Sequence, residues 1–178
     1  MRLRRAGSAL VVGLASLATL VAADIRVTPL VAEGRVFASF TAPAAVTDGA
    51  REVMRSGLQL TFTFDVELRR PSQVWWDRTL ADVTVASSVK FDNLTGVYQV
   101  SKLQDGRVVW SERTKDEAEV RTWMTTFERI AVQPASPLEP NADYYVRVRL
   151  HASPKRTFSL WPWGRNDGAG RADFTFIR

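Results

Sequence analysis

The sequence predicts a mainly β fold: a single antiparallel β-sandwich or partly open barrel of about eight strands with two short helices. Three observations predict it. Apolar and polar residues alternate along several stretches, turn sequences separate these stretches, and two segments with helical periodicity interrupt the series. The chain of 178 residues, 46% hydrophobic and 24% charged, is long enough to bury a core without disulfides.

The clearest strand prediction covers residues 58–69. One face of this stretch is apolar and the other is polar: Leu58, Leu60, Phe62, Phe64, Val66 and Leu68 against Gln59, Thr61, Thr63, Asp65, Glu67 and Arg69. The same period of two recurs in residues 83–91, 144–150 and 174–176. One apolar face per strand is typical of antiparallel sheets with one side in the core and the other in solvent.

Short turn sequences join the predicted strands into hairpins. Glu33-Gly34 separates strands near 25–31 and 35–41, and Asp105-Gly106 precedes a strand at 107–113. A glycine in the turn supplies the positive φ that tight hairpin connections require. The stretch 92–96, Asp-Asn-Leu-Thr-Gly, is expected to end the strand that reaches Phe91.

Two short helices are predicted within this series. The first covers residues 48–56, with Thr47 as its N-cap and Gly57 as a left-handed stop. The second starts with a capping box, Thr114-Lys-Asp-Glu117, and continues into an apolar stripe of Val120, Trp123, Met124 and Phe127. Both helices are expected to cover a sheet face or the mouth of a barrel.

Residues 1–23 have the composition of a secretory signal peptide. A basic start, Met1-Arg-Leu-Arg-Arg5, precedes an uncharged run, and small residues stand before the expected cleavage site at Asp24. We therefore expect a signal peptide at 1–23, a single mainly-β domain at 24–178 and export to the periplasm or another extracytoplasmic space. The alternative is an uncleaved membrane anchor, because the run approaches the roughly 18 residues that span a bilayer.

The charge balance argues against nucleic-acid binding. Three of the 24 basic side chains lie in residues 1–23, which leaves 21 against 19 acidic ones and a net charge of +2. A surface so nearly balanced exerts little attraction on phosphates. The chain has no cysteine, which excludes a lipid-modified cysteine anchor and any disulfide framework.

The sequence contains no familiar catalytic or metal-binding pattern. Its one histidine, His151, is expected on the polar side of a strand, without a Gly-x-Ser-x-Gly motif or a cysteine. Alternation explains Asp65 and Glu67 as solvent-facing. We expect no catalytic residue, no metal and no cofactor. A hydrolase with paired carboxylates, from Asp65, Glu67, Asp77 and Asp82, is a remote alternative.

The tryptophans supply the candidate contact residues. Trp110 and Trp123 fit strand and helix periodicity and are expected in the core, but the pairs Trp75-Trp76 and Trp161-Pro-Trp163 fit neither. The favoured interpretation is that these loops fold over the end of the barrel. Loop tryptophans also suit binding hot spots. The candidate partner-binding residues are therefore Trp75, Trp76, Trp161, Trp163, Arg165 and Asp167.

Four stretches together carry a family resemblance. They are Thr61-Phe-Thr-Phe-Asp-Val-Glu-Leu-Arg-Arg70, Trp76-Asp-Arg-Thr-Leu80, Phe91-Asp-Asn-Leu-Thr95 and Trp161-Pro-Trp-Gly-Arg165. With them the chain resembles an uncharacterised bacterial exported family, "domain of unknown function 4390", over about residues 24–176. The resemblance implies an exported, cysteine-poor and strand-rich protein, and it implies no activity. It also suggests an accessory of the membrane sensor kinases often encoded beside family members.

Two functions are expected from these features. The first is a non-enzymatic envelope protein that binds a protein partner, as an accessory of a membrane sensor. The alternative is a carrier of a lipid or other apolar ligand in a β-barrel cavity lined by the apolar residues of 58–69. Contact with the membrane is expected only through an uncleaved N-terminus or the tryptophan loop.

Overall fold

The computed structural model of the protein describes residues 25–72, 74, 76–151 and 168–177. Nine strands lie in this part of the chain: β1 (Arg26–Ala32), β2 (Arg35–Thr41), β3 (Leu60–Arg70), β4 (Arg78–Asp92), β5 (Val97–Gln104), β6 (Arg107–Thr114), β7 (Thr126–Pro134), β8 (Ala142–His151) and β9 (Ala169–Phe176). Between them lie a 3-10 turn, η1 (Pro43–Ala45), and the helices α1 (Asp48–Arg55) and α2 (Glu117–Thr125). The mainly β class with two helices is confirmed.

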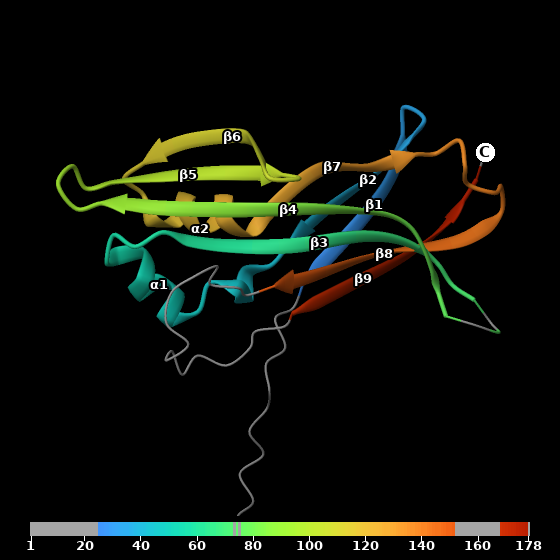
Figure 1. Cartoon of the computed structure of the whole chain (residues 1–178), viewed down its shortest axis with the longest axis horizontal. Coiled ribbons are helices and arrows are strands. Elements are labelled where there is room, and N and C mark those ends of the chain that lie inside the picture. The colour runs from blue at the N-terminus through green and yellow to red at the C-terminus, as the bar shows by residue number, and fades with distance from the viewer. Residues whose placement is uncertain (1–24, 73, 75, 152–167, 178) are drawn as a thin grey trace, which may run out of the picture.

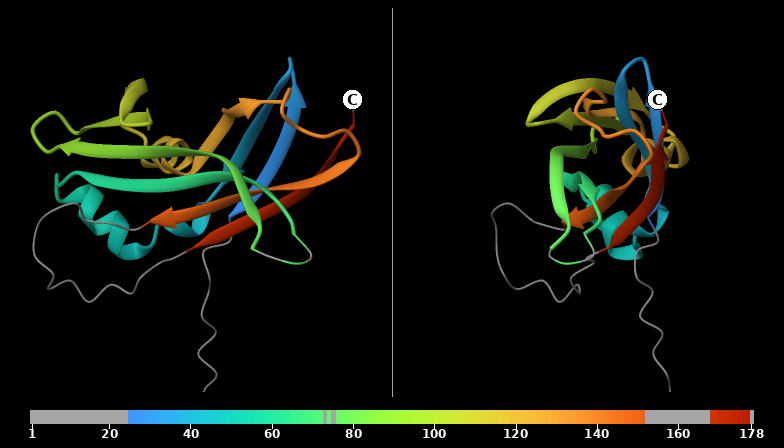
Figure 2. Two further views of the ribbon diagram at one scale, coloured as in Figure 1. Left: turned by 45° about the vertical axis from the view of Figure 1, so that its right-hand side comes forward. Right: turned by 90° about the vertical axis from the view of Figure 1, so that its right-hand side faces the viewer.

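The strands form two antiparallel sheets that pack as a sandwich (Figure 1). The smaller sheet has the order β1-β2-β7, and the larger has the order β6-β5-β4-β3-β8-β9. β1 contacts β9, so the sheets meet along that side (Figure 2). Among the described strands, the sheet edges are β1 and β7 in the smaller sheet and β6 and β9 in the larger, so β6 and β7 are the edges away from the contact between β1 and β9. The result is a sandwich without barrel closure.

Gly170 allows the close approach of the two sheets where β1 meets β9. A β-carbon built on Gly170 would lie 2.1 Å from the carbonyl oxygen of Ile25, well inside van der Waals contact. Only a residue without a side chain lets the two backbones come this close. This glycine thus permits the close packing of the two sheets on the side where β1 meets β9.

The core lies between the two sheets and takes the apolar face of β3. Phe64, Val66 and Leu68 are completely buried, as the alternation predicts, whereas Leu58 precedes the strand and is 63% exposed. Phe64 packs against Phe40 and Phe127, whose ring centroids lie 5.0 and 5.3 Å from its own. These three rings come from β3, β2 and β7, so they join the two sheets. Burial of each ring stabilises the fold by about 1.5–3 kcal/mol.

The two-residue hairpin turns have the backbone that the sequence predicts. Glu33 and Gly34 have φ angles of 52° and 68°, and Asp105 and Gly106 have φ angles of 49° and 79°. Positive φ at both positions is typical of a type I′ turn, whose twist matches that of the flanking strands. The β1–β2 and β5–β6 hairpins are therefore confirmed.

The first helix begins as expected and ends one residue earlier than predicted, at Arg55. The Thr47 hydroxyl accepts a hydrogen bond of 3.2 Å from the Ala50 amide, which caps the N-terminus of α1. Gly57 follows the helix with a φ of 80°. The predicted N-cap and the predicted left-handed glycine are both confirmed, because each depends only on residues close to it in the sequence.

The second helix starts differently from the prediction. Its N-cap is Asp116, whose carboxylate accepts a hydrogen bond of 2.7 Å from the Ala118 amide. Thr114 belongs to β6, and its hydroxyl donates to Glu119 instead. The prediction of a capping box from Thr114 to Glu117 was therefore wrong. A carboxylate is the stronger cap, because its charge also interacts favourably with the helix dipole.

β7 is the strand that the sequence analysis did not predict. α2 ends at Thr125 and β7 begins at the next residue, so Phe127 belongs to a strand rather than to the helical stripe. Phe127 and Val132 are both buried, although they are an odd number of residues apart. A β-bulge explains this spacing: Arg129 has a φ of 49°, and the register against β2 shifts beside it.

No helix in the described part of the chain is long and apolar enough to cross a membrane. The expected signal peptide at 1–23 lies outside the described residues, as does the segment 152–167 between β8 and β9. The expected export and membrane contacts therefore stay predictions.

Candidate functional site

The outer face of the larger sheet carries a row of polar side chains along β3 and β8. The register places Glu67 opposite Arg147 and Arg69 opposite Tyr145. Alternation sends the residues between them into the core, so the polar ones share a single face. This row, the charged strip, consists of Asp65, Glu67, Arg69, Tyr145, Arg147, Arg149 and His151.

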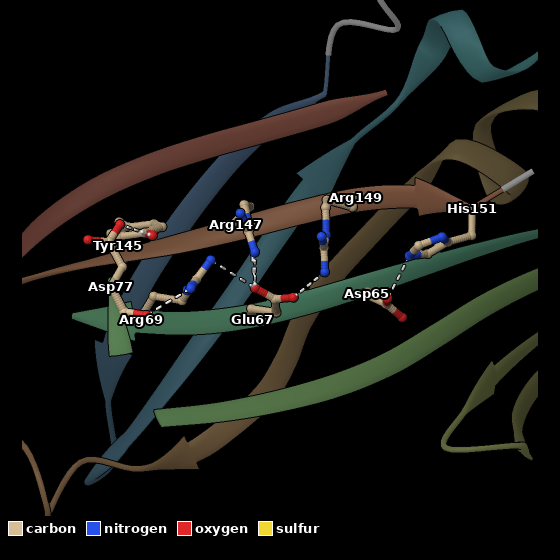
Figure 3. Close-up of polar contacts among 8 residues, drawn as sticks. All are labelled: Asp65, Glu67, Arg69, Asp77, Tyr145, Arg147, Arg149 and His151. Atoms are coloured by element: carbon tan, nitrogen blue, oxygen red, sulfur yellow. Dashed lines mark hydrogen bonds and ion pairs between the residues drawn. The ribbon is translucent and has the colours of Figure 1, made fainter. Parts of the chain in front are cut away.

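Glu67 is the centre of the charged strip (Figure 3). Its Oε2 accepts a hydrogen bond of 2.6 Å from Arg147 Nη2, and its Oε1 accepts one of 2.5 Å from Arg149 Nη2. Arg69 Nη1 lies 3.8 Å from the same carboxylate. Only 10% of the Glu67 side chain is exposed. The prediction that Glu67 faces solvent was therefore wrong, because the arginines of the neighbouring strand cover it.

The charges around Glu67 are unbalanced in favour of arginine. One carboxylate meets three guanidinium groups, so this group of four side chains has an excess of two positive charges. The exposed Asp82, which lies opposite Glu67 on β4, reduces this excess to one. Arg147 and Arg149 remain 29% and 42% exposed. Each guanidinium has five N–H donors, more than Glu67 can accept. The strip can therefore accept a carboxylate or another flat anion from outside, in the paired geometry that guanidinium groups favour.

One end of the charged strip is attached to the loop between β3 and β4. The Tyr145 hydroxyl donates a hydrogen bond of 2.6 Å to Asp77 Oδ2, and Arg69 Nη2 donates one of 2.8 Å to the Asp77 carbonyl. The bond from Tyr145, followed by one from the Ser72 amide, lowers the pKa of Asp77. The pKa of Tyr145 is raised, first by burial and then by its bond to Asp77. The guanidinium of Arg171 covers the Tyr145 ring at 3.7 Å.

His151 and Asp65 form the other end. Nε2 of His151 lies 2.6 Å from Asp65 Oδ2, and the two side chains are 46% and 32% exposed. His151 lies on the polar side of its strand as expected, but its partner was not predicted. Within the described residues, no serine, threonine or lysine hydrogen-bonds to His151, and no cluster of three potential metal ligands occurs. The pair extends the row of charged contacts.

Trp76 lies beside Asp77 and is 91% exposed. It therefore does not cover the end of a barrel, which corrects the favoured interpretation for this residue. Val74, in the same loop, is 82% exposed. The remaining predicted contact residues lie outside the described part of the chain: Trp75, Trp161, Trp163, Arg165 and Asp167.

No sequence pattern predicted the site residues Arg69, Tyr145, Arg147 and Arg149. Their alternation with buried neighbours was visible, and it indicated an outward face. What alternation does not give is which strands pair and in which register. That information decides that Glu67 lies among three arginines.

The chain belongs to a family of unknown function. The family model described as "Domain of unknown function (DUF4390)" matches residues 19–156, more than half of the chain. This match confirms the family itself, over residues 19–156 rather than about 24–176, so the stretch 161–165 lies outside it. The charged strip lies within the matched residues. Comparisons with curated proteins and with solved structures found no match.

Proposed function

We propose that this protein is an exported, non-enzymatic module of the cell envelope that binds a protein partner through the charged strip and Trp76. The composition of residues 1–23 supports export. The family resemblance favours a membrane sensor as the partner. The larger sheet then acts as a rigid support for the binding face.

The observation that carries this proposal is an exposed tryptophan attached to a row of arginines. Tryptophan, tyrosine and arginine are the residues that dominate binding hot spots. Trp76 precedes Asp77, which is hydrogen-bonded to Tyr145 and Arg69, so one peptide bond joins the apolar anchor to a residue fixed to the charged strip. A fully buried tryptophan removes about 150–250 Å² from water, and truncation of such an anchor to alanine typically costs about 2 kcal/mol or more of binding free energy.

The chemistry of the strip indicates what the partner presents. The excess of positive charge around Glu67 suits an acidic segment, and Trp76 suits an apolar pocket next to that segment. β3 and β8 are inner strands of the larger sheet, and the arginines are already held by Glu67. Because these side chains are ordered before binding, little conformational entropy is lost when the partner docks.

Site-specific photo-crosslinking in cells tests this proposal. A photoreactive phenylalanine analogue at position 76 is expected to capture one defined protein. The matched control is the same analogue at Leu94, which is 97% exposed in the turn between β4 and β5. Arg149→Gln in the position-76 variant is expected to reduce the yield of the crosslink. Equal capture at both positions, or capture at neither, would contradict the proposal.

A further inference from the structure

A pocket lies on the side of the sandwich where the sheets do not meet. It has a volume of about 580 Å³ and is lined by residues of β4, β5, β6, α2 and β7. In the chain, α2 follows β6 and precedes β7, and Figure 1 shows it behind β4 and β5. Pockets for small molecules have volumes of about 300–1,000 Å³. None of the residues of the charged strip lines this pocket.

Lys102 of β5 places a cation among the aromatic rings of the pocket. Its ammonium donates a hydrogen bond of 2.8 Å to the Thr126 carbonyl and lies 5.4 and 5.2 Å from the ring centroids of Trp110 and Phe127. Burial lowers the pKa of Lys102, and Glu128 partly opposes this shift. No ion pair among the described residues includes Lys102. The ammonium therefore has donors to offer and no carboxylate in contact.

More than half of the other lining residues are apolar, but Glu128 and Arg129, which forms an ion pair with Glu33, also line the pocket. Trp110 and Trp123 meet edge to face, with ring centroids 5.1 Å apart, and are only partly buried, although both were expected in the core. Leu103, Val109 and Ile130 add aliphatic surface. Val109 is 61% exposed, so an occupant of the pocket could cover it.

The bulge in β7 shapes the opposite wall. Five consecutive residues, 126–130, line the pocket, whereas a regular strand would present only alternate residues. Arg129 keeps a positive φ of 49°, a conformation that costs a non-glycine residue of order 1 kcal/mol or more. Glu33, Asp105 and Asn141 have similar φ angles in turns, so the φ of Arg129 by itself does not indicate a ligand. The bulge shapes the wall, and the unpaired cation is the indication of a ligand.

We propose that this pocket binds a small amphiphile with one anionic group, whose anion pairs with Lys102 and whose apolar part packs against Trp110 and Trp123. The apolar lining makes the ion pair stronger than it would be in water. This site is distinct from a carrier cavity lined by β3, whose Phe64, Val66 and Leu68 are buried in the core. It is also independent of partner binding on the charged strip, so either proposal can fail alone.

A matched pair of fluorescent probes tests the inference. The anionic probe is 1-anilinonaphthalene-8-sulfonate, and its neutral parent is N-phenyl-1-naphthylamine. The folded wild-type protein is expected to bind the sulfonate about tenfold or more tightly than the parent. Dodecanoate is expected to displace the sulfonate, whereas dodecanol is expected to be a weaker competitor. These two measurements need no variant.

Variants then assign the preference to Lys102. Lys102→Met is expected to lose most of the preference for the sulfonate, about tenfold, and to keep the neutral probe within about twofold. Lys102→Arg is expected to restore the preference, and Lys90→Met, an exposed lysine outside the pocket, to leave it unchanged. Near-ultraviolet circular dichroism checks that each variant is folded. Wild type without a preference for the sulfonate, or a folded Lys102→Met variant with the full preference, would overturn the inference.

Discussion

Arg147 lies directly opposite Glu67 in the β3–β8 pair and donates to it a hydrogen bond of 2.6 Å. Arg149 bonds to the second oxygen of the same carboxylate, and Arg69 lies beside it. One nearly buried acid thus orders three cations on the outer face of the sheet. Burial of an unpaired carboxylate would be costly. Here the hydrogen bonds from Arg147 and Arg149 offset that cost and fix the positions of the two guanidinium groups.

Replacing Glu67 should therefore destabilise the fold. Glu67→Gln leaves three guanidinium groups close together without a negative charge. The expected loss in the free energy of unfolding is about 2–4 kcal/mol, since removal of one partner of a buried pair typically costs about 3–5 kcal/mol and these arginines are partly exposed. Urea denaturation measures it.

A matched control is available for this variant. Glu139 is also held by an arginine, Arg70, through hydrogen bonds of 2.6 and 2.7 Å, but its side chain is 64% exposed. Glu139→Gln is expected to change stability much less, because exposed ion pairs contribute little. Similar losses in the two variants would show that burial of Glu67 is not what makes it important.

The pKa of Asp77 should depend on Tyr145. Tyr145→Phe removes the hydrogen bond that is the main cause of the lowered pKa, so the pKa of Asp77 should rise towards its ordinary value of 3.8. Carboxyl carbon shifts in an NMR titration report it. Tyr144→Phe is the control, because the Tyr144 hydroxyl instead accepts a hydrogen bond from the Glu139 amide.

The same bond has a consequence for stability at low pH. Because the pKa of Asp77 is lowered in the folded state, its contribution is fully present above the ordinary pKa of 3.8 and is lost as the pH falls through the folded value. The wild type should therefore lose stability over this acid range more steeply than Tyr145→Phe does. Parallel curves for the two proteins would rule out the assigned cause.

Lys102 should produce a dependence of the same sign, but in the alkaline range. Its pKa in the folded protein lies below the ordinary 10.5, so between these two values the unfolded chain binds more protons. The stability of the wild type relative to Lys102→Met should then rise with pH until about 10.5. Urea midpoints at several alkaline pH values give this difference. A difference that stays flat or falls would mean that Lys102 is not desolvated.

Gly170→Ala should weaken the contact between the two sheets. The new methyl group would be placed 2.1 Å from the Ile25 carbonyl oxygen, and a backbone atom cannot move aside cheaply. The expected loss is about 1–3 kcal/mol, the usual range for an overpacked site. Gly96→Ala, with a φ of 66° and no atom within 4 Å of the new carbon, separates this steric effect from backbone strain. A smaller loss at Gly170 than at Gly96 would contradict the steric account.

Much of the fold could be predicted because its signals are local. Alternation located β3 and β8, and glycine after an acidic residue located the turns at Gly34 and Gly106. β7 was not predicted from the sequence, because the bulge at Arg129 interrupts the alternation of buried and exposed residues between Phe127 and Val132. A bulge is decided by the pairing with β2, which a single stretch of sequence does not contain.

The candidate site could not be predicted from the sequence for the same reason: it depends on which strands pair and in which register. Glu67 looked like any outward residue of a strand until the register with β8 placed Arg147 opposite it. No sequence pattern singled out Lys102, and only the packing of β6 and β7 places the rings of Trp110 and Phe127 beside it. Both sites form through the pairing and packing of strands that are distant in the sequence, so no local motif predicts them.

The affinity of the crosslinked partner for purified variants tests the central proposal most directly. Calorimetry would compare the wild type with Trp76→Ala and with Leu94→Ala, two changes at side chains that are 91% and 97% exposed. Partner binding through the charged strip and Trp76 predicts that Trp76→Ala weakens affinity about tenfold or more, while Leu94→Ala leaves it unchanged. Equal affinities for all three folded proteins would contradict the proposal.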